Sequence, residues 1–354
     1  MTAQSLWNLS DLIAATNGEF VGSDPKSPSK SSPKLSSKSE LQNNIIIDNI
    51  SIDSRTIGKN ELFLAIKGEF FDGHNFIEES FENGASIAII ERDWYEKNYQ
   101  NKYQNKSHNN IPQGNFLIVD DSFAALINMA KYRRQQSQAI FIGVTGSVGK
   151  TSIKEMLKCA LEAHAKTYAT IGNFNNHIGM PLTIARINLD CKFAVLEMGM
   201  NHAGEIAELT KIAQPDVTII NNIEKVHLEN FANLAGIADA KAEIFLGQSS
   251  DNPLNATILN YDNQFFDYLV RKASNIDNII SFGSNNSTPN SSITNSSITN
   301  SSAKNKLADF LQENSPETVQ AGSDKFLADE LDNPDLMNLS KEMSQKWRRL
   351  SEIL

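Results

Sequence analysis

Cysteine is scarce in this sequence: Cys159 and Cys191 are the only two among 354 residues. So few cysteines argue against a disulfide framework and are typical of a reducing cytosol. Long apolar runs are also missing, because no stretch approaches the ~20 apolar residues that a membrane-spanning helix needs. The N-terminus, MTAQSLWNLSDLIAATNG, lacks the basic start and apolar core of a signal peptide. We therefore expect a cytoplasmic protein without membrane insertion.

Basic residues are outnumbered by acidic ones, 32 against 42, which gives a formal net charge of −10. This balance argues against non-specific binding to nucleic acid, and we expect no nucleic-acid partner. An anionic ligand would have to be held by local groups, against the field of the whole chain. Hydrophobic residues make up 40% of the sequence, which is enough to fill the cores of two domains.

Two stretches of low complexity divide the chain. Residues 23–40, SDPKSPSKSSPKLSSKSE, are rich in Ser, Pro and Lys and predict a disordered insert. Residues 284–302 contain the repeat NSSITNSSITNSS and predict an unstructured linker. The tail, 303–354, ends in DLMNLSKEMSQKWRRLSEIL, whose apolar spacing predicts an amphipathic helix. We therefore expect a first domain over 1–135, a second over 136–283, a linker and a helical tail.

Both predicted domains mix strands and helices. Between about 45 and 120, the sequence predicts a small α/β unit with a strand pair in IIIDNISIDS, strands in ELFLAIKG and SIAIIE, and a helix in HNFIEESFENGA. From 139 to 283, strands and helices alternate, which predicts a mostly parallel sheet covered by helices on both faces. The fold class is therefore α/β, and ligands of such parallel sheets bind at the carboxyl ends of the strands.

The segment 140–152, IFIGVTGSVGKTS, is the most informative motif. A β-branched strand ends in a glycine-rich turn, and Lys150 and Thr151 open the helical pattern that follows. Backbone N–H groups in such a turn face an anion, and the helix N-terminus adds partial positive charge. Lys150 would reach the β- and γ-phosphates of a nucleotide, and the Thr151 hydroxyl would bind Mg²⁺. Val144 stands where the general pattern has glycine, so the match is to a variant phosphate loop.

An ordinary strand-to-helix turn is the alternative interpretation of this segment. The register of strand, turn, Lys-Thr and helix favours nucleotide binding instead. The predicted nucleotide-binding residues of the loop are Thr145, Gly146, Ser147, Val148, Gly149, Lys150, Thr151 and Ser152.

Further polar residues lie at or after other predicted strands. Glu197 ends the strand FAVLE and is either a Mg²⁺ ligand beside the phosphates or a carboxylate satisfied at a strand end. His227 lies in a polar loop and, taken alone, is a weak candidate for a cation or substrate site. Lys241 lies on the helix GIADAKAEIFLG, where a lone lysine is ordinarily solvated. The apolar spacing predicts that this helix packs through Ile237, Ile244, Phe245 and Leu246.

The stretch 170–179, TIGNFNNHIG, places amide and imidazole side chains between two glycines. Asparagine amides can donate hydrogen bonds to phosphate or carboxylate oxygens without charge repulsion. The same composition is also typical of a polar loop rich in turn-forming residues. From the residues alone, both interpretations stay open.

Five motifs, in this order, resemble the ATP-dependent Mur ligases of peptidoglycan synthesis: TGSVGKT, TIGNFNNHIGMP, LEMGMNHAGEI, NNIEKVHLENF and AKAEIF. The third and fifth resemble the branch of the family that adds D-alanyl-D-alanine. In the first block, Asp53-Ser54-Arg55, the stretch from Leu62 to Gly68, and Asp72-Gly73-His74 are similar to the family's UDP-substrate-binding domain. The resemblance covers residues from about 45 to 283.

The resemblance implies a role for each candidate. It makes Lys150, His227 and Lys241 catalytic, with Lys241 carbamylated by CO₂. It makes Thr151, Glu197 and His227 the Mg²⁺ ligands, and it brings Asn260 and Asp262 to the adenosine of ATP. The residues that it assigns to the UDP-linked substrate are Ser54, Arg55, Lys67, Gly68, Asp72, His74, Thr170, Asn173, Asn175 and Asn176.

The reaction that the resemblance implies is amide-bond formation with ATP and Mg²⁺ as cofactors. The γ-phosphate would pass to the terminal carboxylate of UDP-MurNAc-tripeptide, and the amine of D-Ala-D-Ala would then displace phosphate. Family members continue with a third, Rossmann-like domain, which is not evident after Gly283. Two alternatives therefore stand: a ligase, completed if needed by a separate C-terminal partner domain, and a catalytically impaired relative that binds ATP and UDP-substrate without ligating them.

Overall fold

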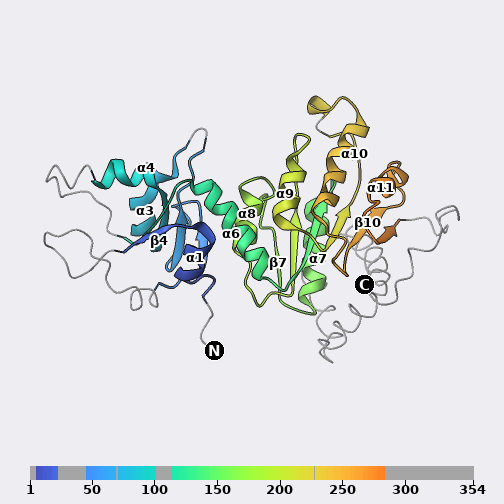
Figure 1. Ribbon diagram of the computed structural model, residues 1–354. Coiled ribbons are helices and arrows are strands. Elements are labelled where there is room, and N and C mark those ends of the chain that lie inside the picture. Colours follow the sequence, from blue (N-terminus) through green and yellow to red (C-terminus); the bar gives the residue numbers. More distant parts are fainter. Residues whose placement is uncertain (1–4, 23–44, 69–70, 101–113, 227, 284–354) are drawn as a thin grey trace, which may run out of the picture. The chain divides into compact units, whose positions relative to one another are not determined.

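The computed structural model describes residues 5–22, 45–68, 71–100, 114–226 and 228–283. The predicted disordered insert 23–40, the linker 284–302 and the helical tail 303–354 lie outside the described residues. The described chain packs into two units (Figure 1). The first contains the residues up to Ala139 together with Thr170–Asp190 and Lys211–Ala213, and the second contains the rest. The predicted boundary at 135/136 lies close to this division, but the sequence did not indicate that 170–190 packs with the first unit.

The first unit is built on a five-stranded mixed sheet in the order β1-β5-β4-β3-β2. Strand β1 is antiparallel to β5, and the other neighbours are parallel. Its elements are α1 (Leu9–Thr16), β1 (Glu19–Val21), β2 (Asn49–Ser51), β3 (Glu61–Leu64), η1 (Gly73–Phe76), α3 (Ile77–Glu82), β4 (Ala85–Glu91), α4 (Arg92–Tyr95), η2 (Glu96–Gln100), β5 (Phe116–Val119), α6 (Ser122–Gln136) and α8 (Gly179–Ala185).

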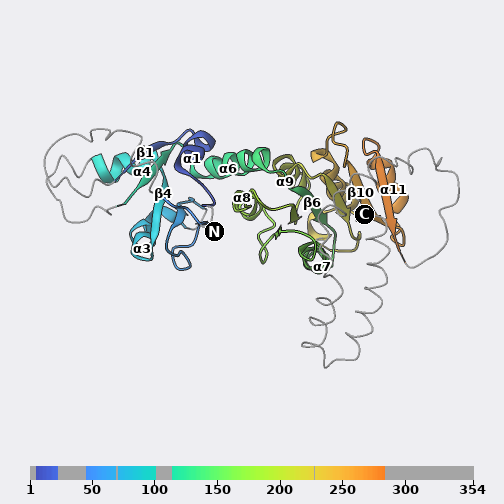
Figure 2. The same cartoon turned by 90° about the horizontal axis from the view of Figure 1, so that it is seen from below.

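Apolar side chains fill both faces of this sheet. Because successive residues of a strand point to opposite faces, Ile87 and Ile89 of β4 join one cluster and Ala88 and Ile90 join the other. The first cluster is covered by α1, α6 and α8, and the second by α3 and α4. Figure 2 shows α1 and α6 on one side of β4 and α3 on the other. Because both faces of β4 are buried, its sequence SIAIIE is a nearly continuous apolar run.

Helix α8 is held in the first unit by packing and by two long-range hydrogen bonds. All seven of its residues are buried, and it packs along α6. The indole Nε1 of Trp7 donates to the carbonyl of Ala185 at 2.8 Å, and Arg186 Nε donates to the carbonyl of Ile50 at 2.7 Å. These contacts join residues more than a hundred positions apart, which periodicity along the sequence does not reveal.

The second unit is a six-stranded parallel sheet in the order β11-β10-β9-β6-β8-β7. The chain starts at β6, builds β7 and β8 on one side, and then crosses to build β9, β10 and β11 on the other. A ligand crevice is expected at such a switch point. The elements are β6 (Ile140–Thr145), α7 (Lys150–Glu162), β7 (Thr167–Ala169), β8 (Phe193–Glu197), α9 (Glu205–Ala213), β9 (Val217–Ile220), η3 (Leu228–Asn230), α10 (Leu234–Ala242), η4 (Glu243–Gly247), β10 (Ala256–Asn260), α11 (Phe266–Lys272) and β11 (Asn278–Phe282).

The α/β class and the parallel second sheet confirm the sequence prediction, while several local predictions were wrong. The segment IIIDNISIDS forms one short strand, β2, and a bridge between Ile47 and Trp7, not a strand pair. The predicted helix through Lys241 ends at Ala242 and continues as the 3₁₀ turn η4. Within that turn Leu246 is 64% exposed, so it does not belong to the packing face, whereas Ile237, Ile244 and Phe245 are buried.

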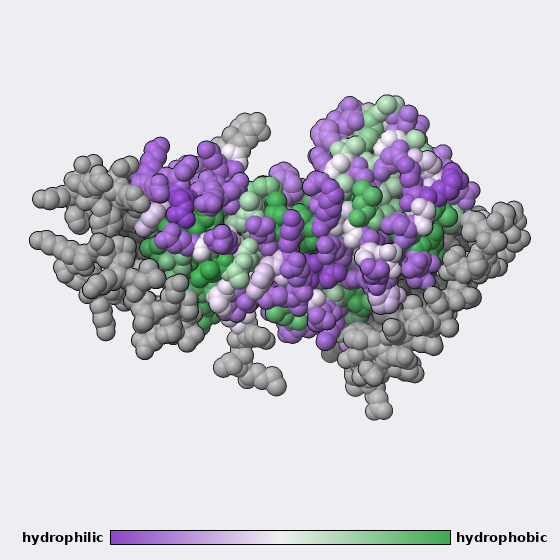
Figure 3. Space-filling view, in the orientation of Figure 1, coloured by the Kyte–Doolittle hydropathy of each residue, from purple (hydrophilic) through white to green (hydrophobic). Residues whose placement is uncertain are grey.

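The surface of the described residues is mostly hydrophilic on the face shown in Figure 3, with apolar side chains interspersed. Among the described residues, no helix combines the length and apolar character needed to cross a bilayer. The large apolar side chains that are most exposed include Phe71, Val148 and Ile171, and each of these lies in a loop predicted to contact a ligand.

Candidate nucleotide and substrate sites

The predicted phosphate loop joins β6 to α7 at the centre of the second sheet. Thr145 ends the strand, and its hydroxyl donates to the carbonyl of Met198 at 2.9 Å, which ties the loop to the end of β8. Gly149 caps α7 in the left-handed conformation, with φ of 77°. The backbone angle favours glycine, and a Cβ at this position would lie 2.9 Å from the side-chain nitrogen of Asn221, which would have to shift.

Lys150 is half-buried at the start of α7. Its ammonium donates to the loop carbonyls of Gly146 at 2.9 Å and Ser147 at 3.4 Å. Burial lowers the pKa of Lys150, and the carboxylate of Glu197 opposes that shift. A cation held by carbonyl dipoles beside a helix N-terminus is suited to meet phosphate oxygens.

Glu197 ends β8 with a buried carboxylate that is 2% exposed. The hydroxyl of Thr151 donates to its Oε2 at 2.9 Å. The predicted pair of magnesium ligands is therefore brought together, and a hydroxyl beside a carboxylate is an oxygen donor set that suits a hard cation. The third predicted ligand, His227, lies outside the described residues. Within the described residues, no group of three or more His, Cys, Asp and Glu side chains is placed to hold a metal ion.

Lys241 is buried at the end of α10, contrary to the solvated position ordinary for a helical lysine, with 2% of its surface exposed. Burial and the neighbouring charge of Lys150 lower its pKa to about 7. Burial is the larger of these two causes. Lys241 is therefore an amine that is largely neutral just above neutral pH, which is an unusual state for lysine.

Two residues after Lys241, the carboxylate of Glu243 caps helix α9. Its Oε1 accepts from the backbone N–H of Gly204 at 2.7 Å, and its Oε2 accepts from that of Ala207 at 3.0 Å. The hydroxyl of Thr210 also donates to the carbonyl of Ile244 at 2.9 Å. The turn that follows Lys241 is thus fixed to the start of α9, directly after the segment that carries Glu197.

The remaining nucleotide candidates lie at the carboxyl end of β10 or in the phosphate loop. Asn260 is half-buried, and its Oδ1 accepts from the backbone N–H of Asp262 at 3.0 Å, while Asp262 itself is exposed. Ser152 is exposed in the first turn of α7. Sequence reasoning missed Asn221 and Asn222, which follow β9 and bond to the backbone of Val148. Two adjacent asparagines after a buried strand were the available signal.

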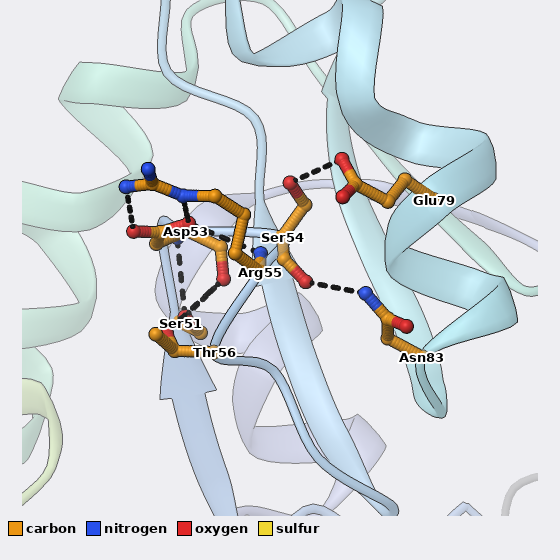
Figure 4. A network of polar contacts seen from close by, with 7 residues as sticks. All are labelled: Ser51, Asp53, Ser54, Arg55, Thr56, Glu79 and Asn83. Carbon is orange, nitrogen blue, oxygen red and sulfur yellow. Dashed lines mark hydrogen bonds and ion pairs between the residues drawn. The ribbon is translucent and has the colours of Figure 1, made fainter.

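In the first unit, the Asp53-Ser54-Arg55 turn follows β2 and is closed by its own side chains (Figure 4). Arg55 pairs with Asp53 through Nε at 2.9 Å and Nη2 at 2.7 Å. This pairing lowers the pKa of Asp53, chiefly through the hydrogen bonds from Arg55. Ser54 donates to Glu79 of α3 at 2.7 Å, and Asn83 donates to the carbonyl of Ser54 at 2.9 Å.

Buried Ser54 therefore anchors the turn, whereas Arg55 is 80% exposed and faces solvent. Of these two substrate candidates, Arg55 is the one whose side chain is placed to reach a ligand.

A second turn of the first unit carries the candidates Lys67, Gly68, Asp72 and His74. The backbones of Lys67 and Asp72 form an isolated antiparallel β-bridge there. His74 is buried: its Nδ1 lies 2.6 Å from Asp72 Oδ1, and its Nε2 accepts from the backbone N–H of Glu91 at 2.9 Å. This arrangement uses both ring nitrogens and places the proton on Nδ1. Direct contact between His74 and substrate stays a prediction, and the bonds present give it the role of fixing Asp72.

The TIGNFNNHIG loop leads into α8. Thr170 is buried, Asn173 is exposed and Asn175 is half-buried. The side-chain oxygen of Asn176 is already engaged: Oδ1 accepts from the backbone N–H groups of Ile178 at 3.2 Å and Gly179 at 2.8 Å. The amide nitrogens of Asn176 and of exposed Asn173 can donate to a ligand. All ten residues predicted to bind the UDP-linked substrate thus belong to the first unit.

Two family models match the chain: the Mur ligase middle domain over residues 144–321, and the Mur ligase family catalytic domain over residues 46–131. The UDP-N-acetylmuramoyl-tripeptide--D-alanyl-D-alanine ligase of Rickettsia prowazekii is 38% identical over 246 residues, covering 69% of this chain and 51% of that protein. The ligase of the same name from Bacillus subtilis is 39% identical over 210 residues, covering 59% and 43%. The chain therefore spans about half the length of the curated relatives it matches.

Solved structures that resemble this chain come from the same family. Crystal structure I of MurF from Acinetobacter baumannii matches with a TM-score of 0.58 and 30% identity, covering 78% of this chain and 53% of that one. MurF from Thermotoga maritima in complex with ADP matches with a TM-score of 0.51 and 31% identity, covering 66% and 50%. Because the middle-domain model alone spans half of the residues and its motifs form the site described above, the chain belongs to the Mur ligase family.

Proposed function

We propose that the second unit binds ATP with magnesium, that the first binds UDP-MurNAc-tripeptide, and that the chain serves ATP-dependent addition of D-Ala-D-Ala. The observation that carries the nucleotide part is the 2.9 Å contact between Thr151 and the buried Glu197 at the phosphate loop. The Thermotoga maritima MurF structure is a complex with ADP, which supports the proposal that this fold binds a nucleotide. The named activity of the relatives supports the substrates.

The phosphate loop would bind ATP through the first-turn N–H groups of α7 and the ammonium of Lys150. Thr151 and Glu197 would hold magnesium together with phosphate oxygens, and the ion would neutralise charge on the transferring phosphoryl group. The substrate carboxylate attacks the γ-phosphorus, and the bond from that phosphorus to the bridging oxygen of ADP breaks. The amine of D-Ala-D-Ala then attacks the acyl carbon, and phosphate leaves with the C–O bonding pair.

Lys241 would be carbamylated, and its lowered pKa supports this assignment. A neutral amine can attack CO₂ to form an N–C bond with loss of one proton, whereas an ammonium cannot. With a pKa of about 7, the amine is available at the pH of a cell. The carbamate would place an anion beside the ammonium of Lys150, an attraction that the neutral amine does not offer.

The test of the carbamate is a ¹³C NMR spectrum with labelled bicarbonate. Wild type should give a carbamate resonance that Lys241→Ala lacks. Short carboxylic acids should partly restore turnover in that variant by filling the vacated space. A Lys241→Ala protein with full turnover would overturn the assignment.

The whole function is tested by phosphate release from ATP in the presence of UDP-MurNAc-tripeptide and D-Ala-D-Ala. We expect release that depends on all three substrates and is lost in Glu197→Gln, which keeps the shape of the side chain and removes its charge. Calorimetry with each ligand separates the two halves of the proposal. If both ligands bind but no phosphate is released, the two binding sites stand and ligation by this chain alone is ruled out. If neither ligand binds, the proposal is overturned.

A further inference from the structure

The backbone of Val148, in the phosphate loop, is held at both ends by side chains from outside the loop. Its N–H donates to Asn222 Oδ1 at 3.0 Å, and its carbonyl accepts from Asn221 Nδ2 at 2.8 Å. The side chain of Val148 is half exposed, so its own packing does not fix this peptide. Two consecutive asparagines after β9 therefore determine where the tip of the loop lies.

The glycines of the loop leave room for the same asparagine. A Cβ at Gly146 would lie 3.0 Å from Asn221 Cβ, and one at Gly149 would lie 2.9 Å from Asn221 Nδ2. The close approach on both sides of Val148 shows that the loop is folded around this one side chain. Gly146 and Gly149 thus serve the contact with Asn221 in addition to their backbone angles.

The neighbouring residue Ser147 is held by backbone groups of the same segment. Its N–H donates to the carbonyl of Asn222 at 3.0 Å, and the N–H of Glu224 donates to its hydroxyl at 2.8 Å. The N–H groups of Ser147 and Val148 are thus used within the protein. The N–H groups in the first turn of α7, which have no acceptor inside a helix, are left to meet a phosphate.

We infer that Asn221 and Asn222 are positioning residues for the nucleotide. They hold the loop in the form in which the first turn of α7 and Lys150 face the phosphates, so less ordering is required when the nucleotide binds. Asn221 does this as a donor to a carbonyl, and Asn222 does it as an acceptor from an amide. This inference rests on the proposed function, because it assumes that the loop binds a nucleotide.

Asn221 acts as a hydrogen-bond donor and Asn222 as an acceptor, so the same substitution by aspartate should affect the two positions differently. Asn221→Asp places a carboxylate oxygen against the carbonyl of Val148, where a donor is needed. Asn222→Asp keeps an acceptor for the N–H of Val148 and makes that bond charge-assisted. Both variants add one negative charge at adjacent positions, so a difference between them measures the hydrogen bonds. Asn275→Asp, which adds the same charge at an exposed position of the second unit, is the control for charge alone.

Calorimetric titration with ADP and Mg²⁺ should show Asn221→Asp binding about tenfold more weakly than Asn222→Asp, a difference of ~1.4 kcal/mol. Asn275→Asp should bind like wild type. Melting temperatures without nucleotide should differ little between the two aspartate variants, which separates positioning from folding. Equal affinities in the two variants, or a loss that follows a lower melting temperature, would overturn the inference.

A pH series gives a signature that a purely structural role would not produce. At a pH low enough to protonate the carboxyl of Asn221→Asp, its O–H can donate to the carbonyl of Val148. Its affinity relative to wild type should therefore recover, while that of Asn222→Asp should not. If wild type fails to bind ADP at any pH, the proposed function and this inference fall together. If wild type binds and the variants behave alike, only the inference falls.

Discussion

The polar side chains of the two units are satisfied in different ways. In the first unit the candidate groups pair with one another: Arg55 with Asp53, and His74 with Asp72. In the second unit the pKa values of half-buried Lys150 and buried Lys241 are both lowered, chiefly by burial. The first arrangement stabilises a shape that exists without ligand. The second stores unfavourable charge that an anionic ligand would relieve.

This difference shows where binding energy is expected to change most. A group that already has its partner gains little when a ligand arrives, since one hydrogen bond replaces another. A buried cation beside another cation gains much more from a phosphate, because the low dielectric strengthens the attraction. Substitutions in the second unit should therefore have larger effects on ligand binding than equivalent ones in the first.

The largest effect is expected for Lys150→Ala. This change removes the ammonium held at the phosphate loop, so affinity for ATP and ADP should fall well beyond tenfold, or ~1.4 kcal/mol. Lys158→Ala is the matched control, because Lys158 lies on the same helix and pairs at the surface with Glu162. Calorimetry that gives both variants the affinity of wild type would contradict the assignment of the loop.

The next effect concerns stability and its dependence on pH. The pKa of Lys241 is about 7 in the folded chain and 10.5 when unperturbed, so between these values the unfolded chain binds a proton that the folded one lacks. In CO₂-free buffer, where Lys241 carries no carbamate, the stability of wild type should therefore rise as pH increases from 7 to 10.5. Lys241→Met removes this penalty and should be more stable by several kcal/mol at or below pH 7.

Urea unfolding at several pH values measures this gap, which should narrow as pH approaches 10.5. Lys192→Met, at an exposed position, should show no such pH-dependent gap. A constant difference between Lys241→Met and wild type across the range would mean that Lys241 is not a buried, destabilising charge.

A smaller effect is expected for Glu243→Ala. The substitution removes both hydrogen bonds that the carboxylate accepts at the start of α9, and the loss of a cap typically costs ~1–2 kcal/mol. Asp251→Ala, which removes an exposed carboxylate, is the control. Unfolding curves that superimpose for the two variants would show that the cap contributes nothing to stability.

The smallest effect on stability is expected for Arg55→Ala. Its guanidinium is exposed and pairs only with a neighbour in the same turn, so the melting temperature should stay unchanged. Affinity for UDP-MurNAc-tripeptide should nevertheless fall, because Arg55 is the side chain of this turn that faces solvent. A Ser54→Ala variant should show the reverse, since buried Ser54 anchors the turn to α3. A fall in melting temperature in Arg55→Ala would contradict this division of roles.

Much of the second unit could be predicted from the sequence because its signals are local. The phosphate loop, the alternation of strands and helices, and Glu197 at a strand end all follow from short segments. The burial of Lys241 did not follow, because a lone lysine on a helix gives no signal about what packs over it. Asn221 and Asn222 were missed for the same reason: their partner, Val148, lies more than seventy residues earlier.

The first unit was predicted less completely. Helix α8 belongs to it through contacts with Trp7 and α6 that no local pattern reveals. His74 is a predicted substrate residue, and the structure adds that it is buried and in contact with Asp72. Its Nε2 accepts from the backbone N–H of Glu91 in β4, and a motif alone cannot show such a contact.

A crossed titration tests the central claim, that each unit carries its own site, most directly. Wild type, Lys150→Ala and Arg55→Ala are each titrated with ADP and Mg²⁺ and, separately, with UDP-MurNAc-tripeptide. Lys150→Ala should lose affinity for ADP and keep it for the UDP-linked ligand, and Arg55→Ala should do the opposite. If either variant loses both ligands while remaining folded, or if neither variant loses its own ligand, the assignment of the two sites to the two units is contradicted.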